Sequence, residues 1–283
     1  MTKGLREFVC LGALVLFATA ASAQQSDQQA KCINKVNKAA SKVQAAQGKA
    51  NAACVKEFVK GSISGANAAD NCVLDDPKDK VEGKQQNVLN DENKNCIGGE
   101  LPDFGYTSGA TAGTVAYQVE VDLIRDVFGN PVDSGLFICD TNPDECLCQR
   151  QAIDRVEKLF RAMSKLWVKC KKAALAIGKD PFPAGAANIG ELQQCVTNGS
   201  IALSVQADTK GKLAAGELQM SDTIGQFCTP GGNEEFPGVC PSGATLVTCL
   251  RDQVECRFCK MVNGVDAATI DCAAWSGSAS CPP

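Results

Sequence analysis

Histidine is absent from the 283-residue sequence. This absence excludes catalysis by Ser-His-Asp or Cys-His groups, zinc hydrolysis with histidine ligands and Cys-x-x-Cys-His attachment of haem, because each needs an imidazole. Tryptophan and tyrosine number only two each, which is few for a cleft that binds sugars. Paired carboxylates remain as acid/base candidates, but they fall in predicted helix caps and loops, where acids are common: Asp75, Asp76, Glu234 and Glu235. We therefore expect a protein that is not an enzyme and has no cofactor.

Long apolar runs are also absent after residue 23, since none approaches the roughly 18 residues that span a bilayer. The N-terminus has the pattern of a signal peptide. Lys3 and Arg6 precede an apolar run from Phe8 to Ala20, and residues 21–23 have the small-x-small form of a cleavage site. We predict a signal peptide over residues 1–23 and a secreted protein, extracellular or periplasmic, with no transmembrane anchor after cleavage.

Cysteine, in contrast, is abundant, with 17 residues in the whole sequence. Cys10 lies in the predicted signal peptide, so an even number is left for an oxidising compartment and eight disulfides can form. Aromatic residues make up only 5% of the chain, which indicates a thin core. Disulfides, at about 2–5 kcal/mol each, are then expected to carry much of the stability.

Residues 142–178 have the pattern of one long helix. Asn142 is placed to cap it, Pro143 suits its first turn, and Gly178 is a natural stop. Between these ends the apolar residues recur at alternating spacings of three and four, which places them on one stripe: Ile153, Val156, Phe160, Met163, Trp167, Cys170, Ala174 and Ile177. The stripe predicts a partner helix.

The cysteine spacing predicts how that partner is attached. Cys148 and Cys170 are 22 residues apart, about 33 Å along a helix, so they cannot bond to each other. An antiparallel partner supplies Cys228 and Cys195, which predicts the pairs Cys148–Cys228 and Cys170–Cys195.

The same design occurs earlier in the chain. Cys32 and Cys54 are also 22 residues apart, and Lys80 to Cys96 matches Lys212 to Cys228 in length. These spacings predict an internal duplication and the pairs Cys32–Cys96 and Cys54–Cys72. The first helix is expected from about residue 27 to 60, with Ser26 and Gln29 as a capping box. Its apolar stripe is weaker and interrupted by Gln47, so this copy is expected to pack less tightly.

The first helix also carries a basic ridge on the face opposite its apolar stripe: Lys31, Lys35, Lys38, Lys42, Lys49 and Lys56. One interpretation is a site for an anionic polymer of the cell surface or the extracellular space. The other is a solvated helix face whose charge is balanced within the molecule. No aromatic side chains interleave the lysines to stack bases, so nucleic acid is not an expected partner.

Other segments leave alternatives open. Residues 115–128 alternate as a strand would, but they also fit a helix ending at Gly129, which we favour because it joins a helical bundle. A short helix is expected near residues 191–196, and Asn198-Gly199-Ser200 matches a glycosylation acceptor. A helix is expected from Ser242 to about Asn263. Within it, Cys256 and Cys259 have the spacing of a redox pair or of half a zinc site with Cys146 and Cys148, although structural disulfides are the favoured interpretation.

Three segments resemble an uncharacterised family of exported, cysteine-rich helical proteins that are abundant in deltaproteobacteria and related environmental bacteria. They are residues 249–259 with Asn263 and Asp271-Cys272, the stretch from Cys146-Leu147-Cys148-Gln149 to residues 168–172, and residues 208–212. The resemblance covers roughly residues 119–281. It implies export and a helical, cysteine-rich character, and it brings no known activity.

Together these patterns predict an all-α protein of disulfide-stapled helical hairpins. The expected segments are the signal peptide (1–23), the first hairpin (24–100), a connector with one helix (101–141), the second hairpin (142–230) and a cysteine-rich C-terminal subdomain (231–283). The expected role is a non-catalytic structural or binding protein of the extracellular space or cell envelope. The alternatives are a binder of anionic surface polymers and a thiol redox or metal-binding protein using Cys256 and Cys259. The sequence leaves these cysteines without assigned partners: Cys139, Cys146, Cys240, Cys249, Cys256, Cys259, Cys272 and Cys281.

Overall fold

The computed structural model describes residues 24–76, 78–179, 182–197, 211–228, 236–240, 246–276 and 281. Several predictions from the sequence lie outside these residues: the signal peptide over 1–23, the acceptor Asn198-Gly199-Ser200, the carboxylates Glu234 and Glu235, and the helix start at Ser242.

The fold of the described chain is all-α, as predicted. Its elements are α1 (Asp27–Val59), α2 (Ala68–Asp75), α3 (Lys80–Asn95), α4 (Gly109–Phe128), the 3₁₀ turn η1 (Val132–Gly135), α5 (Pro143–Ala174), α6 (Ile189–Thr197), α7 (Lys212–Phe227), α8 (Leu246–Asp266) and α9 (Cys272–Ser276). No strand occurs among the residues described.

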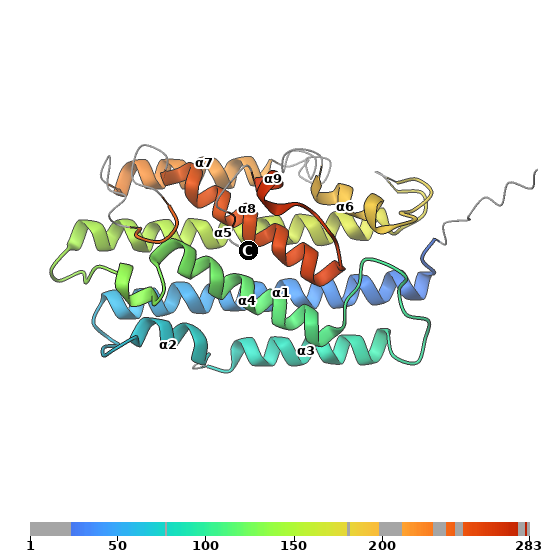
Figure 1. Ribbon diagram of the computed structural model, residues 1–283, viewed down its shortest axis with the longest axis horizontal. Helices are drawn as coiled ribbons and strands as arrows, with labels where there is room; N and C mark the ends of the chain where they lie inside the picture. Colours follow the sequence, from blue (N-terminus) through green and yellow to red (C-terminus); the bar gives the residue numbers. More distant parts are fainter. Residues whose placement is uncertain are drawn as a thin grey trace, which may run out of the picture.

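The helices form two layers (Figure 1). In one layer α3, α1, α5 and α7 lie side by side in that order, with α1 and α5 at the centre. In the other layer α4 crosses α1 and α3, while α8 crosses α5 and α7 and also packs against α4. The two predicted hairpins, α1 with α3 and α5 with α7, therefore share one bundle with the C-terminal helices.

The long helix α1 begins as its sequence predicts. The Ser26 hydroxyl accepts the Gln29 amide, and the Gln29 side chain returns to the Ser26 amide, which completes the capping box.

Helix α5 begins at Pro143, as predicted, but its capping and its C-terminal end differ from the prediction. The Asn142 side chain makes no cap, and its amide donates to the Thr141 hydroxyl. The helix ends at Ala174 rather than near Gly178, because the Ala174 carbonyl accepts the amide of Ala186 from the following loop. Ile177 is consequently outside the helix and 71% exposed, so its assignment to the apolar stripe was wrong.

Helix α4 confirms the helical interpretation of residues 115–128 and begins six residues earlier, where the Ser108 hydroxyl accepts the amide of Thr111. It packs against α1 and α3 on one side and α8 on the other. Apolar residues are buried on two faces as a result, which explains why the sequence also suggested a strand.

Eight disulfides hold the bundle, and four of them join the same cysteines that the helix spacing predicts: Cys32–Cys96, Cys54–Cys72, Cys148–Cys228 and Cys170–Cys195. The others are Cys139–Cys146, Cys240–Cys249, Cys256–Cys281 and Cys259–Cys272. In each hairpin one disulfide joins the long helix to the end of its partner, at Cys96 or Cys228, and the other joins it to the short helix α2 or α6 that precedes the partner. The duplication that this symmetry suggests stays a prediction.

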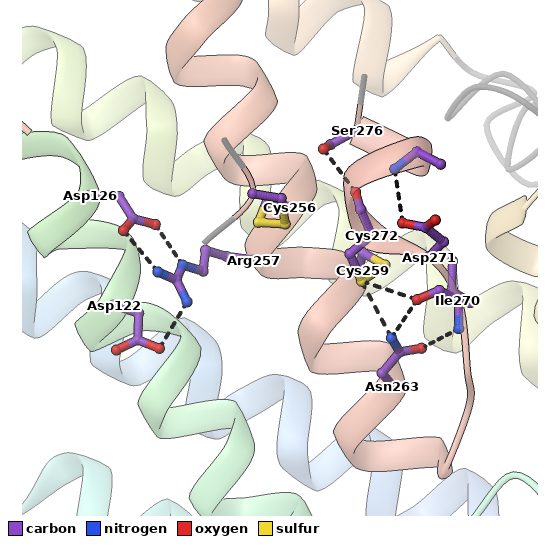
Figure 2. The surroundings of a disulfide bond; sticks show 12 residues. Asp122, Asp126, Cys256, Arg257, Cys259, Asn263, Ile270, Asp271, Cys272 and Ser276 are labelled. Carbon is purple, nitrogen blue, oxygen red and sulfur yellow. Dashed lines mark hydrogen bonds and ion pairs between the residues drawn. A yellow bond between two sulfur atoms is a disulfide. The ribbon is translucent and has the colours of Figure 1, made fainter. Parts of the chain in front are cut away.

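Helices α8 and α9 pack against the rest of the bundle through polar and aromatic contacts. Arg257 of α8 donates to both carboxylate oxygens of Asp126 and to Asp122, both on α4 (Figure 2). Phe258 lies edge-on to Phe160 and Trp167 of α5 and also contacts Trp275 of α9. These contacts hold α8 against α4 of its own layer and against α5 of the other layer.

Candidate functional site

A groove of about 840 Å³ runs between α1 and the beginning of α3. Its floor is formed by small or apolar groups of α1, together with the Cys54–Cys72 disulfide: Ala45, Ala46, Ala50 and Ala53. Gly83 of α3 lies on the opposite side, and a Cβ added there would meet no atom within 4 Å. The groove exists because small residues face each other across this helix pair.

Lysines surround the groove from three segments: Lys42 and Lys49 of α1, Lys78 of the α2–α3 turn, and Lys80 and Lys84 of α3. We call this feature the lysine groove. All five lysines are exposed, and none of them forms an ion pair within the described part of the chain. Clustered cations over an apolar floor create a positive potential that attracts anions.

The carboxylates beside the groove reduce this charge only in part. Three acids line it: Glu57, Asp76 and Asp79. The Asp76 carboxylate accepts the amides of Lys80, Val81 and Glu82, so it caps α3. The cap explains the acid at this position, which the sequence had offered as a nominal catalytic carboxylate beside the exposed Asp75.

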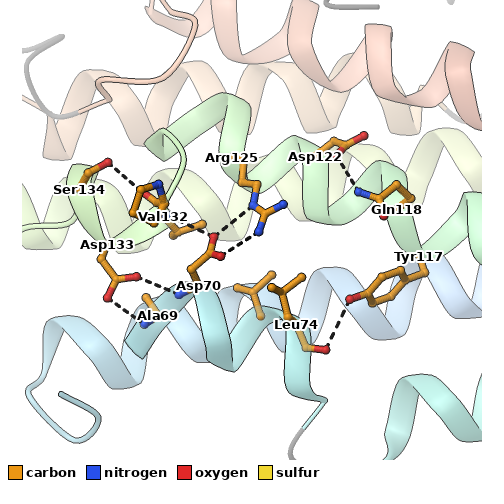
Figure 3. A network of polar contacts seen from close by, with 12 residues as sticks. Ala69, Asp70, Leu74, Tyr117, Gln118, Asp122, Arg125, Val132, Asp133 and Ser134 are labelled. Carbon is orange, nitrogen blue, oxygen red and sulfur yellow. Dashed lines mark hydrogen bonds and ion pairs between the residues drawn. The ribbon is translucent and has the colours of Figure 1, made fainter. Parts of the chain in front are cut away.

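Helix α2, which carries Cys72 at one end of the groove, is held in place by a polar network between α2, α4 and η1 (Figure 3). Arg125 of α4 donates two hydrogen bonds to Asp70, which lowers the pKa of that carboxyl. The Asp133 carboxylate accepts the amides of Ala69 and Asp70 at the start of α2. Two anchors therefore hold this short helix against α4 and η1.

The structure leaves all six lysines of the predicted ridge exposed on α1, and two of them, Lys42 and Lys49, line the groove. The other four lie along the same helix: Lys31, Lys35, Lys38 and Lys56. The sequence interpretation missed Lys78, Lys80 and Lys84 as site residues. The predicted disulfides Cys32–Cys96 and Cys54–Cys72 contained the information needed to find these lysines, because they fix the register in which α3 lies beside α1.

A second feature absent from the sequence analysis is a buried pair of acids at the centre of the bundle. Glu120 of α4 and Glu157 of α5 meet beside Gly48 of α1, where an added Cβ would lie 1.7 Å from Glu157 Oε2. Gln44 donates to the Glu120 carboxylate, and Asn51 donates to the Glu120 carbonyl. Helices α1, α4 and α5 thus share one polar layer.

Burial changes the proton affinity of both acids in this layer. It raises the pKa of Glu120 well above its ordinary range, and the neighbouring charge of Glu157 raises it further. Burial also raises the pKa of Glu157 to about 7, although a hydrogen bond with Glu120 and the charge of Arg161 oppose this rise. Both acids therefore keep their protons to higher pH than exposed carboxyl groups do.

A buried ion pair joins α5 to α8 near the C-terminal ends of both helices, and α1 also contributes to it. Lys171 of α5 contacts the carboxylate of Asp266 of α8, and Asn37 of α1 donates to that carboxylate at 3.1 Å. The Lys171 ammonium also lies 4.6 Å from the centre of the Trp167 ring. Burial lowers the pKa of Lys171 and raises that of Asp266, while the attraction between them opposes both changes.

The proposed redox or metal role of Cys256 and Cys259 meets a direct obstacle. Cys256 pairs with Cys281 and Cys259 with Cys272, so the two sulfurs are not bonded to each other (Figure 2). Cys146 and Cys148 are likewise in separate disulfides, with Cys139 and Cys228. Within the described residues no group of three or more metal-binding side chains comes together. The thiolates that either role requires are therefore consumed in disulfides.

Comparisons with known proteins add no relative: no family model, curated protein or solved structure matches this chain. The family resemblance drawn from the sequence therefore stays a prediction. Among the described helices, none combines the length and apolar character that crossing a membrane demands. The eight disulfides fit an extracellular or other oxidising compartment.

Proposed function

We propose that the protein is a non-catalytic binding protein of the extracellular space or cell envelope, and that the lysine groove is its site for anionic ligands of the cell surface. The observation that carries this proposal is the convergence of five exposed lysines from three segments on one groove of about 840 Å³. This volume falls within the range of small-molecule sites, and the lysines supply the charge that selects an anion.

The alternative is a solvated helix face whose charge is balanced internally. Internal balance by ion pairs would place carboxylates against the lysines, but the described residues form no such pair there. Asp76 is the acid best placed to pair with the lysines, but its carboxylate accepts hydrogen bonds from three backbone amides of α3. This arrangement favours an external anion over internal compensation.

Retention of the exported protein on an immobilised acidic polysaccharide, eluted with a salt gradient, tests the proposal. The quadruple substitution Lys42→Gln, Lys49→Gln, Lys80→Gln and Lys84→Gln removes four groove charges. Its matched control removes four exposed charges from α5: Lys158→Gln, Lys165→Gln, Lys169→Gln and Lys172→Gln.

We expect the groove variant to elute at clearly lower salt than the control, because removing localised contacts reduces binding more than removing net charge alone. Equal elution of the two variants would show that net charge, not the groove, causes retention. Failure of the unsubstituted protein to be retained at low salt would count against binding of polymeric anions altogether.

A further inference from the structure

We propose that the ligand of the lysine groove is a single-chain anionic amphiphile, a molecule with one long alkyl chain and one phosphate, sulfate or carboxylate head. This inference rests on the proposed function and names its ligand class. The alkyl chain lies along the alanine floor, and the head group binds among the lysines of the rim.

The floor of the groove has the chemistry of an alkyl site. It presents the methyl groups of four alanines and the Cys54–Cys72 disulfide. Apart from the charged side chains, the described lining residues offer one hydrogen-bonding side chain, Asn87, and no aromatic ring. A polysaccharide needs many directional hydrogen bonds along its length, whereas an alkyl chain needs only contact with apolar groups.

The shape of the groove also suits a chain. The lining residues of α1 extend from Lys42 to Glu57, which at 1.5 Å per helical residue is roughly 22 Å. Gly83 leaves open space on the α3 side, so the floor is accessible along that side. An elongated apolar floor bordered by cations is complementary to a molecule with an apolar chain and an anionic end.

The second hairpin has bulkier contacts at the positions that correspond to the floor of the lysine groove. Ala50 and Leu166 occupy equivalent positions, four residues before Cys54 and Cys170, and Leu166 is buried. Where the first hairpin has Lys84, the second has Gly216, and a Cβ added there would contact Leu159 at 3.6 Å. The second hairpin keeps lysines at the positions that match Lys42, Lys49 and Lys80, so what sets the first hairpin apart is the small floor residue Ala50 and the added charge of Lys84.

Isothermal titration of the exported protein with alkyl phosphates below their micelle concentrations tests the proposal. The series is octyl, decyl and dodecyl phosphate, with inorganic phosphate as the headgroup alone. Each added methylene should tighten the dissociation constant by about two- to fourfold, the larger value for full burial, so the series should span at least about tenfold. The expected stoichiometry is one, with the far-ultraviolet circular dichroism unchanged.

Two variants locate the site. Ala50→Leu introduces the side chain of the second hairpin into the groove and should weaken dodecyl phosphate binding at least tenfold without changing charge. Its control, Ala214→Leu, adds the same bulk to an exposed position of α7 and should bind normally. Lys80→Gln with Lys84→Gln should weaken binding of the whole series by a similar factor, because every member carries the same head.

The outcomes separate this inference from the proposed function. Affinity independent of chain length, or normal binding by Ala50→Leu, would overturn the amphiphile proposal, and retention on acidic polysaccharide would then leave anion binding in place. Absence of binding to dodecyl phosphate together with absence of retention would overturn both.

Discussion

The buried acids Glu120 and Glu157 should make the bundle less stable as the pH rises through neutrality, and Glu157→Gln should remove a defined part of that loss. The pKa of Glu157 is about 7 in the folded chain against an ordinary value of 4.5. A carboxyl with a raised pKa binds its proton more tightly in the folded state, so unfolding releases protons between these two values. The free energy of unfolding then falls as the pH increases across this window.

The size of the effect follows from the same values. The rise from 4.5 to about 7, at 1.36 kcal/mol for each pH unit, corresponds to about 3 kcal/mol between pH 4.5 and pH 8. The stabilising contribution is fully present below pH 4.5 and is lost as the pH rises through about 7. The pKa of Glu120 is raised as well, which extends the decline to higher pH.

The substitution Glu157→Gln keeps the side-chain volume, and its amide can donate to Glu120 without titrating. Guanidinium unfolding with the disulfides intact, followed by circular dichroism of the helices, measures the free energy of unfolding at pH 4.5, 6, 7 and 8. The difference between variant and unsubstituted protein should shift by about 3 kcal/mol in favour of the variant between pH 4.5 and pH 8.

Two comparisons make the result specific. Glu82→Gln removes an exposed carboxylate of α3 and serves as the control for the loss of one negative charge. Glu255→Gln should also flatten part of the curve, because burial raises the pKa of this α8 carboxyl to about 7. A Glu157→Gln curve parallel to that of the unsubstituted protein would refute the raised pKa of Glu157.

Three further predictions concern stability alone. Lys171→Met leaves Asp266 buried without its cation and should lower the free energy of unfolding in denaturant by about 3–5 kcal/mol. The double variant Lys171→Met with Asp266→Leu should lose clearly less, because no unpaired charge stays buried. Equal losses would contradict the energetic coupling between these two residues. Replacing both cysteines of the Cys54–Cys72 pair, which are 18 residues apart, should lower the free energy of unfolding by about 3 kcal/mol. Replacing both cysteines of the Cys32–Cys96 pair, which are 64 residues apart, should lower it by about 4 kcal/mol, because a longer loop is closed. The reverse order of unfolding midpoints would contradict this loop-entropy explanation. Gly48→Ala should destabilise the folded protein, because the added Cβ would collide with Glu157. Gly225→Ala on α7, where nothing lies within 4 Å of the added Cβ, should stabilise it by up to about 1 kcal/mol. A higher thermal unfolding midpoint for both variants would show that Glu120 and Glu157 can move aside at little cost.

The architecture was the more predictable part because helical geometry is rigid. The distance of about 33 Å between cysteines 22 residues apart on a helix excludes a bond between them, and an antiparallel partner then leaves few pairings. The errors in the same region have tertiary causes. Nothing local to α5 indicates that Ala186 will take the Ala174 carbonyl and end the helix before Gly178.

The candidate site was predictable only where it lies on one helix. The α1 lysines form a periodic pattern, but Lys78, Lys80 and Lys84 join them through the register of α3. Glu157 is followed directly by Lys158 in a helix rich in charged residues, so its sequence context is that of an exposed surface. Its burial depends on Gly48, which lets α1 approach α5 closely enough to enclose both acids.

The most direct test of the account is to map where an anionic ligand touches the protein. Amide chemical shifts of isotope-labelled protein, titrated with dodecyl phosphate, would locate the contact residue by residue. The account predicts that the changes concentrate on residues 42–57 of α1 and residues 78–87 around the start of α3, and that Ala50→Leu suppresses them. Changes concentrated on α5 and α7, or spread evenly over the surface, would contradict the assignment of the lysine groove as the binding site.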